Sequence, residues 1–117
     1  MSDHEQVELL QRLYGEVGRI RWRALQRFFA QGVVLKVSSG RDLVKVAAIF
    51  VNDSKEQLKK LMESSEVVVP GDEQARDWFH DDVEVWSLVV TPFVLVQELN
   101  DKEQNEQDET QNGVWFY

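Results

Sequence analysis

Residues 83–99 read VEVWSLVVTPFVLVQEL. Two stretches rich in β-branched and aliphatic residues, 83–90 and 93–99, flank the dipeptide Thr91-Pro92. Such stretches favour β-strands. A proline between them marks a turn, a bulge or a sheet edge, because proline has no amide hydrogen to donate to a ladder. This part of the chain therefore predicts two strands of a sheet.

Two earlier stretches predict the remaining strands. Residues 33–37 and 43–51 are also rich in β-branched residues, and Ser38-Ser39-Gly40-Arg41-Asp42 between them has the composition of a hairpin turn. In residues 43–51 both alternating sets of side chains are largely apolar, which is typical of a strand inside a sheet. We expect the Asp42 side chain to bond amides of the turn.

Apolar residues at helical spacing predict an N-terminal helical hairpin. The first helix covers residues 3–17, opens with a capping box from Ser2 to Glu5 and stops near Gly18. The second carries an apolar stripe from Trp22 to Phe29, and Gly32 is its C-terminal residue. On this stripe Trp22 is predicted to lie in the core.

Two further helices are predicted between the pairs of strands. One follows the capping sequence Asn52-Asp53-Ser54, and the other opens at Asp72 with Ala75, Trp78 and Phe79 directed inward. The predicted fold is α+β: a helical hairpin, then a small, mainly antiparallel four-stranded sheet with two further helices packed on it. Residues 1–99 form this single domain.

Composition limits the class of protein. The chain has 117 residues, 43% of them hydrophobic, and no cysteine. It has no apolar stretch near the roughly 20 residues of a membrane span, and its N-terminus lacks the pattern of a signal peptide. We expect a cytoplasmic protein without disulfides and without membrane association.

Residues 100–117 form a tail of different character. Residues 100–111 contain five acids, one base and no apolar side chain; we call this stretch the acidic segment. The chain then ends in Trp115, Phe116 and Tyr117, the aromatic tip. Each aromatic side chain can bury some 150–250 Å², so the tip is predicted to bind the protein's own domain, a twin subunit in a homodimer, or another protein. A solubilising tail without a specific partner is the alternative.

A basic cluster opposes the acidic tail. Between residues 12 and 27 five arginines stand against one acid, although the net charge of the chain is −8. Arg19, Arg21, Arg23 and Arg27 are candidate partner-binding residues for an acidic surface, the tail included. RNA binding through the Arg19–Arg27 cluster is a weaker alternative, because an acidic protein is repelled by phosphates.

Two other groups of polar residues bear on function. Gln97 stands near the end of an apolar strand, and a pocket near Gln97, Arg41 and Asp42 would define a small-ligand-binding protein or an enzyme. Glu73, Asp77, His80 and Asp81 share one helix face, which we interpret as the solvated side of that helix. We assign no catalytic residue, no metal ligand and no cofactor. The leading hypothesis is a non-enzymatic protein–protein interaction module that uses its acidic tail and aromatic tip.

Several short motifs resemble a bacterial family of small proteins known as domain of unknown function 2288. The motifs are Ile20-x-Trp22-x-x-Leu25, Phe29-Ala30-x-Gly32-Val33-Val34, Asp42-Leu43-Val44-x-Val46-Ala47, Asp72-Glu73-Gln74-Ala75-x-x-Trp78 and Val89-Val90-x-Pro92-Phe93-Val94-Leu95-Val96-Gln97. The resemblance covers about residues 18–99 and leaves the tail outside. The family has no established activity, so the resemblance implies no catalytic residues.

Overall fold

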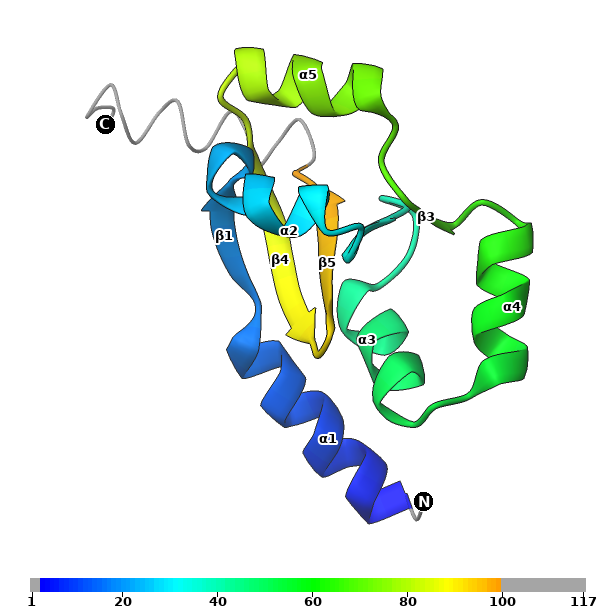
Figure 1. The fold of residues 1–117 in the computed structure, drawn as a ribbon. Coiled ribbons are helices and arrows are strands. Elements are labelled where there is room, and N and C mark those ends of the chain that lie inside the picture. Colours follow the sequence, from blue (N-terminus) through cyan, green and yellow to red (C-terminus); the bar gives the residue numbers. More distant parts are fainter. Residues whose placement is uncertain (1–2, 100–117) are drawn as a thin grey trace, which may run out of the picture.

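The computed structural model describes residues 3–99, which form a mixed α+β fold (Figure 1). The elements in order are α1 (Asp3–Glu16), β1 (Gly18–Arg21), the 3-10 helix η1 (Trp22–Leu25), α2 (Gln26–Ala30), β2 (Val34–Val37), α3 (Leu43–Val51), α4 (Lys55–Glu63), β3 (Val67–Val68), α5 (Asp72–His80), β4 (Glu84–Val90) and β5 (Phe93–Glu98). Within this range no helix is both long and apolar enough to cross a membrane.

One five-stranded sheet organises these elements, in the order β1-β4-β5-β2-β3. The predicted final hairpin is confirmed: β4 and β5 pair antiparallel across a two-residue turn at Thr91-Pro92, and they lie in the centre of the sheet (Figure 1). β2 pairs parallel with β5, whereas β1 and β3 pair antiparallel with their neighbours. The sheet is therefore mainly antiparallel as predicted, but it has five strands where four were expected.

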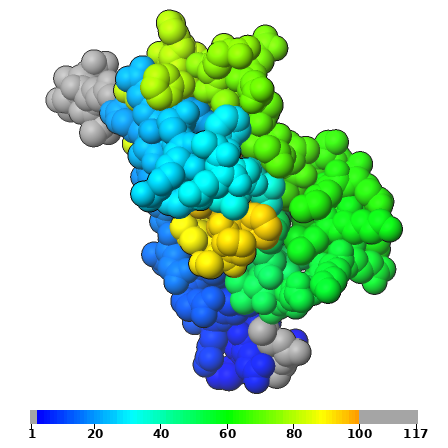
Figure 2. All heavy atoms as spheres, viewed as in Figure 1, coloured from blue at the N-terminus to red at the C-terminus, as the bar shows by residue number. Residues whose placement is uncertain are grey.

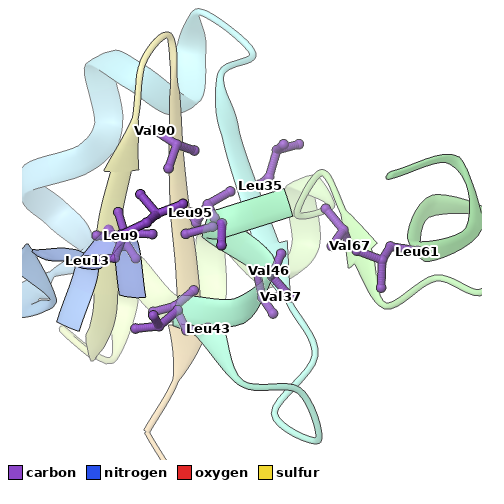
Figure 3. Close-up of a cluster of buried hydrophobic side chains, with 14 residues drawn as sticks. Leu9, Leu13, Leu35, Val37, Leu43, Val46, Leu61, Val67, Val90 and Leu95 are labelled. Atoms are coloured by element: carbon purple, nitrogen blue, oxygen red, sulfur yellow. The ribbon is translucent and has the colours of Figure 1, made fainter. Parts of the chain in front are cut away.

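Helices cover both faces of the central strands, which explains their nearly continuous apolar sequences. On one face, Leu35, Leu88 and Leu95 pack with buried residues of α1 and α3, as Figure 3 shows for part of this cluster. On the other face, Val94 and Val96 pack against Trp22 and Trp78 of η1 and α5. Successive residues of β5 thus enter two different hydrophobic clusters.

The prediction of a central strand at residues 43–51 was wrong, because this segment is the helix α3. Asp42 is its N-cap, and Asp42 Oδ1 accepts hydrogen bonds from the amides of Val44 (2.9 Å) and Lys45 (3.3 Å). The Asp42 side chain does bond nearby amides, but they belong to a helix and not to a hairpin turn. A short segment that is apolar on all sides fits a buried helix as well as a buried strand, so periodicity could not separate them.

The predicted N-terminal helical hairpin was also wrong in part. The first helix ends at Glu16 close to the expected residue, but β1 then separates it from η1 and α2. In β1 the exposed Arg19 and Arg21 alternate with the half-buried Ile20, a pattern suited to an edge strand. Gly32 ends the helical segment as predicted, with a positive φ of 77°.

The two later helices begin where the sequence indicated. α4 follows Ser54, and α5 begins at Asp72. Ala75 and Trp78 are buried as predicted, but Phe79 is 44% exposed. In the space-filling view the β4–β5 turn, in yellow, reaches the surface between the cyan α2 region and the green α3 and α4 region (Figure 2).

Candidate functional site

An open hollow of about 420 Å³ lies between the C-terminal end of α1, the start of α3 and the central hairpin; we call it the Trp86 hollow. It is lined by Tyr14, Val17, Arg41, Asp42, Leu43, Val44, Trp86 and Gln97. The lining contains all three residues of the pocket that the sequence suggested. Its volume falls within the range of roughly 300–1,000 Å³ that is usual for small-molecule sites.

Gln97 holds one wall of the hollow in place. Its Nε2 donates hydrogen bonds to the backbone carbonyls of Ser38 (2.8 Å) and Arg41 (2.7 Å). These two residues begin and nearly end the loop 38–42, which leads from β2 into α3. The half-buried Gln97 therefore ties this loop to the sheet, as a buried amide requires partners for its donors.

Asp42 joins the loop to α1 as well as to α3. The Tyr14 hydroxyl donates to Asp42 Oδ2 at 3.0 Å, while the other carboxylate oxygen caps α3. The hydrogen bond to Asp42, and then the charge of that carboxylate, raise the pKa of Tyr14 above its usual value. One carboxylate thus orients a tyrosine hydroxyl at the edge of the hollow.

Arg41 fixes the outer side of the same loop. Its guanidinium makes two bonds of 2.9 Å to the two carboxylate oxygens of Glu66, a bidentate geometry that specifies orientation. Ser64 Oγ also donates to Glu66 Oε2 at 2.7 Å. The hydrogen bonds from Arg41 and Ser64 lower the pKa of Glu66 below its usual value. The Arg41 guanidinium is therefore paired with Glu66 and holds the loop 38–42 in place.

Trp86 forms the aromatic wall of the hollow. It lies on β4 directly opposite Gln97 of β5 and is half-buried. The Arg19 guanidinium lies 4.9 Å from the centre of the indole ring, a cation–π contact between neighbouring residues of β1 and β4. Charge, a π surface and hydrogen-bonding groups thus meet at one place.

The sequence did not single out Trp86 or Tyr14 as site residues. A two-residue turn at Thr91-Pro92 pairs Val90 with Phe93, and counting outward pairs Trp86 with Gln97. Strand pairing from the turn could therefore have found Trp86. Nothing in the sequence placed Tyr14 beside Asp42, because that contact depends on how α1 crosses the sheet.

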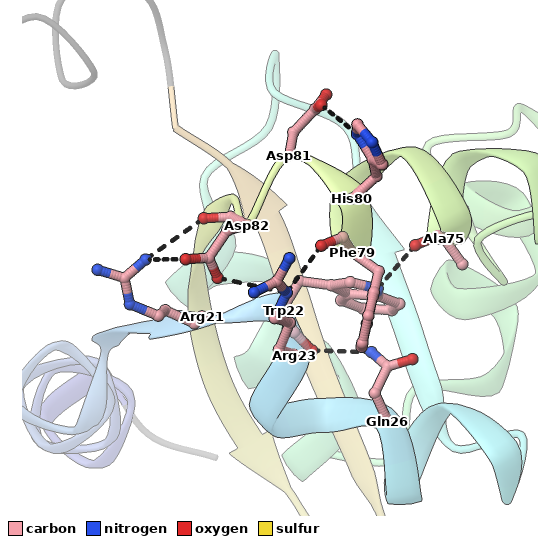
Figure 4. Close-up of polar contacts among 9 residues, drawn as sticks. All are labelled: Arg21, Trp22, Arg23, Gln26, Ala75, Phe79, His80, Asp81 and Asp82. Atoms are coloured by element: carbon pink, nitrogen blue, oxygen red, sulfur yellow. Dashed lines mark hydrogen bonds and ion pairs between the residues drawn. The ribbon is translucent and has the colours of Figure 1, made fainter.

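The arginines of the basic cluster contact different partners within the domain. Arg21 Nη1 lies 2.8 Å from Asp82 Oδ2 and Arg23 Nε lies 3.7 Å from Asp82 Oδ1, so both arginines hold the turn between α5 and β4 (Figure 4). Arg27 stacks over Phe28 on α2, with its guanidinium 4.9 Å from the ring centre. Arg19 is the member of the predicted set that contacts a residue of the hollow.

Two other contacts in Figure 4 join η1 to α5 on the face of the sheet opposite to α1 and α3. The buried Trp22 donates its indole hydrogen to the Ala75 carbonyl at 3.0 Å, and Arg23 Nε donates to the Phe79 carbonyl at 2.8 Å. The Arg23 guanidinium also lies 4.9 Å from the centre of the Phe79 ring. Phe79 therefore contacts an arginine and stays partly exposed, outside the core.

Residues of the predicted tail lie outside the described range. This applies to the acidic segment and to the three partner-binding residues Trp115, Phe116 and Tyr117. Within residues 3–99 no group of three or more histidine, cysteine, aspartate or glutamate side chains is arranged to hold a metal ion. The His80 ring lies 3.3 Å from Asp81 on the exposed side of α5.

A larger depression of about 620 Å³ lies between α1, α3, α4 and the β4–β5 turn. Its charged groups include Arg12 and Glu16, whose side chains are 3.9 Å apart and largely exposed. Because hydrogen bonds orient the polar groups of the Trp86 hollow and do not orient this pair, the Trp86 hollow is the better-organised candidate site.

The chain is a small α+β protein whose sheet is covered by helices on both faces. The Trp86 hollow, a candidate site lined by aromatic and polar residues, lies at one corner of this sheet. The family described as Protein of unknown function (DUF2288) matches residues 8–98, so the chain belongs to this family. The match confirms the resemblance seen in the sequence and ends just before the tail.

A solved structure supports the same assignment of fold. The NMR solution structure of PA1075 from Pseudomonas aeruginosa is similar to this chain, with 34% sequence identity and a TM-score of 0.69. The similarity covers 87% of this chain and 95% of PA1075. None of the curated proteins compared with the chain matches it.

Proposed function

We propose that this DUF2288 protein is a binding protein whose Trp86 hollow receives a flat, apolar group that carries a negative charge. One observation carries the proposal: a tryptophan ring, an oriented tyrosine hydroxyl and an anchored glutamine line a hollow of small-molecule size, and Arg19, which is not itself a lining residue, stacks on the tryptophan ring. Binding sites of this kind combine apolar walls with a few fixed polar groups.

The charges at the hollow select the ligand. The Arg41 guanidinium is used by Glu66 and the Asp42 carboxylate by Tyr14 and the cap of α3. Arg19 does not line the hollow, but it lies over the indole of Trp86, which does, so a ligand that packs on Trp86 can bring an acidic group toward this cation. An aromatic carboxylate, whether a small molecule or part of an acidic peptide, fits this chemistry.

A nuclear magnetic resonance titration tests the proposal. Indole-3-acetate serves as the probe for the full chain, and we expect saturable shifts of the Trp86 indole and Gln97 side-chain amide signals. Arg19→Ala should weaken binding at least fivefold. Arg27→Ala is the matched control, because Arg27 also stacks over an aromatic ring at 4.9 Å but away from the hollow. The proposal is wrong if the Trp86 signal shows no saturable shift in the wild type and also none in a variant that lacks the aromatic tip.

The interaction-module hypothesis, with the tail as its binding element, remains a proposal and leads to the inference below. RNA binding through Arg19, Arg21, Arg23 and Arg27 remains a weaker proposal. The contacts of these arginines with Trp86, Asp82 and Phe28 do not favour it, because each of the four is already engaged with an acid or an aromatic ring of the domain.

A further inference from the structure

We propose that the aromatic tip occupies the Trp86 hollow of its own chain, so that residues 100–117 act as a built-in competitor of the hollow's ligand. This inference rests on the proposed function, because it requires the hollow to be a binding site. It adds a specific occupant and a form of regulation.

The starting point of the tail favours this hollow over the depression of about 620 Å³. Gln97, which lines the Trp86 hollow, precedes the acidic segment by three residues. The larger depression lies at the opposite end of β5, beside the Thr91-Pro92 turn. Six strand residues at about 3.3 Å each separate the two ends of β5 by roughly 20 Å. The tail therefore leaves the described domain next to the proposed receptor.

The length of the tail permits return to the hollow. Trp115 lies sixteen positions after Leu99. Sixteen residues treated as a random coil have a typical end-to-end distance of roughly 20–24 Å, comparable to the shorter dimensions of the domain, 35 and 24 Å. A linker of this kind gives an effective concentration on the order of millimolar, so even a weak contact would be substantially occupied.

The chemistry of the tail matches the hollow. The acidic segment carries five acids and one base, and Arg19, although not a lining residue of the hollow, provides a cation against the ring of Trp86, which lines it. Trp115, Phe116 and Tyr117 supply aromatic rings for the Trp86 wall, and aromatic rings attract one another in offset-stacked or edge-to-face arrangements. An acidic segment that ends in aromatic residues therefore suits Trp86 and its neighbour Arg19 together.

Two variants of the full chain test the inference. In the first, Trp115, Phe116 and Tyr117 are all replaced by alanine, which keeps the acidic segment. In the second, a control, Glu106 and Asp108 are replaced by asparagine or glutamine while the tip is kept. The Trp86 indole signal should shift in the first variant relative to the wild type, with no change in signals of the buried Trp22. The control should give a smaller shift in the same direction.

Competition separates this inference from the proposed function. With a tip affinity of about 0.1 mM and an effective concentration near 1 mM, indole-3-acetate should bind the alanine variant about tenfold more tightly than the wild type. Equal, measurable affinity in both would overturn the inference and leave the proposed function intact. A Trp86 shift that grows with protein concentration would also overturn it, because the tip would then bind a second copy.

Discussion

Replacing Gln97 by methionine removes the two hydrogen bonds that hold the loop 38–42 while nearly preserving side-chain length. The lost bonds are 2.8 and 2.7 Å long and end on the backbone carbonyls of Ser38 and Arg41. A hydrogen bond contributes about 0.5–1.5 kcal/mol net, so the pair stabilises the fold by roughly 1–3 kcal/mol. The lower part of this range is expected, since Arg41 is exposed and water can replace part of the loss.

Urea unfolding at equilibrium measures this loss. We expect a lower midpoint and an unchanged dependence on urea, because the surface exposed on unfolding stays nearly the same. In a thermal experiment each kcal/mol corresponds to about 4–8 °C for a domain of this size. Amide hydrogen exchange in the loop 38–42 should also accelerate, because the loop loses its attachment to the sheet.

A neighbouring substitution provides the control. Glu98 follows Gln97 on β5, and its carboxylate lies 3.1 Å from Lys36 Nζ in a partly exposed ion pair. Glu98→Gln should cost less than about 1 kcal/mol, because exposed ion pairs contribute little. If Gln97→Met costs no more than this control, the loop does not depend on Gln97 and the account of the hollow's wall is wrong.

Three further predictions concern the core and the titrating groups. Trp22→Phe should destabilise the protein by about 1–3 kcal/mol from the lost hydrogen bond to the Ala75 carbonyl alone, before any cavity is counted. Thermal unfolding would measure this loss, and a negligible change would contradict the role of that bond. The pKa of Glu66 is lowered in the folded state, so the Glu66 carboxylate contributes to stability above its ordinary pKa, about 4.3, and this contribution is lost as pH falls through the lowered pKa. The stability difference between wild type and Glu66→Gln should therefore shrink in acid. A constant difference would refute the linkage. The pKa of Tyr14 is raised, so the contribution of its hydroxyl to stability is complete below about pH 10 and is lost as pH rises through the raised pKa. Asp42→Asn should bring the pKa of Tyr14, followed by nuclear magnetic resonance, back toward 10. An unchanged titration would show that Asp42 does not cause the raised pKa.

Local sequence signals located most element boundaries correctly. The turn at Thr91-Pro92, the end of the second helical segment at Gly32 and the start of α5 at Asp72 were all read from residues whose backbone preferences are strong. The buried position of Trp22 followed from its place on an apolar stripe. These features could be predicted because each depends on neighbours in the chain.

Features set by contacts between distant residues could not be predicted in this way. Residues 43–51 have the composition of a strand, but Asp42 caps their first turn and they form a helix, most of whose first six residues are buried. Residues 18–21 became a strand because β4 offers them an edge to pair with. A strand requires a partner, and the partner is about 65 residues away in the sequence.

The same distinction between local signals and contacts of distant residues applies to the candidate site. The sequence by itself determined the family, the central hairpin, the two opposite charge clusters and the importance of Gln97, because these follow from residue type and spacing. Only the tertiary structure decided that Gln97 anchors the loop 38–42, that Tyr14 bonds Asp42, and that Arg19 lies over Trp86. The first two contacts require α1 and the loop 38–42 to pack beside the central hairpin, and the third requires β1 to pair with β4. No local preference encodes these arrangements, because the paired elements are distant in the chain.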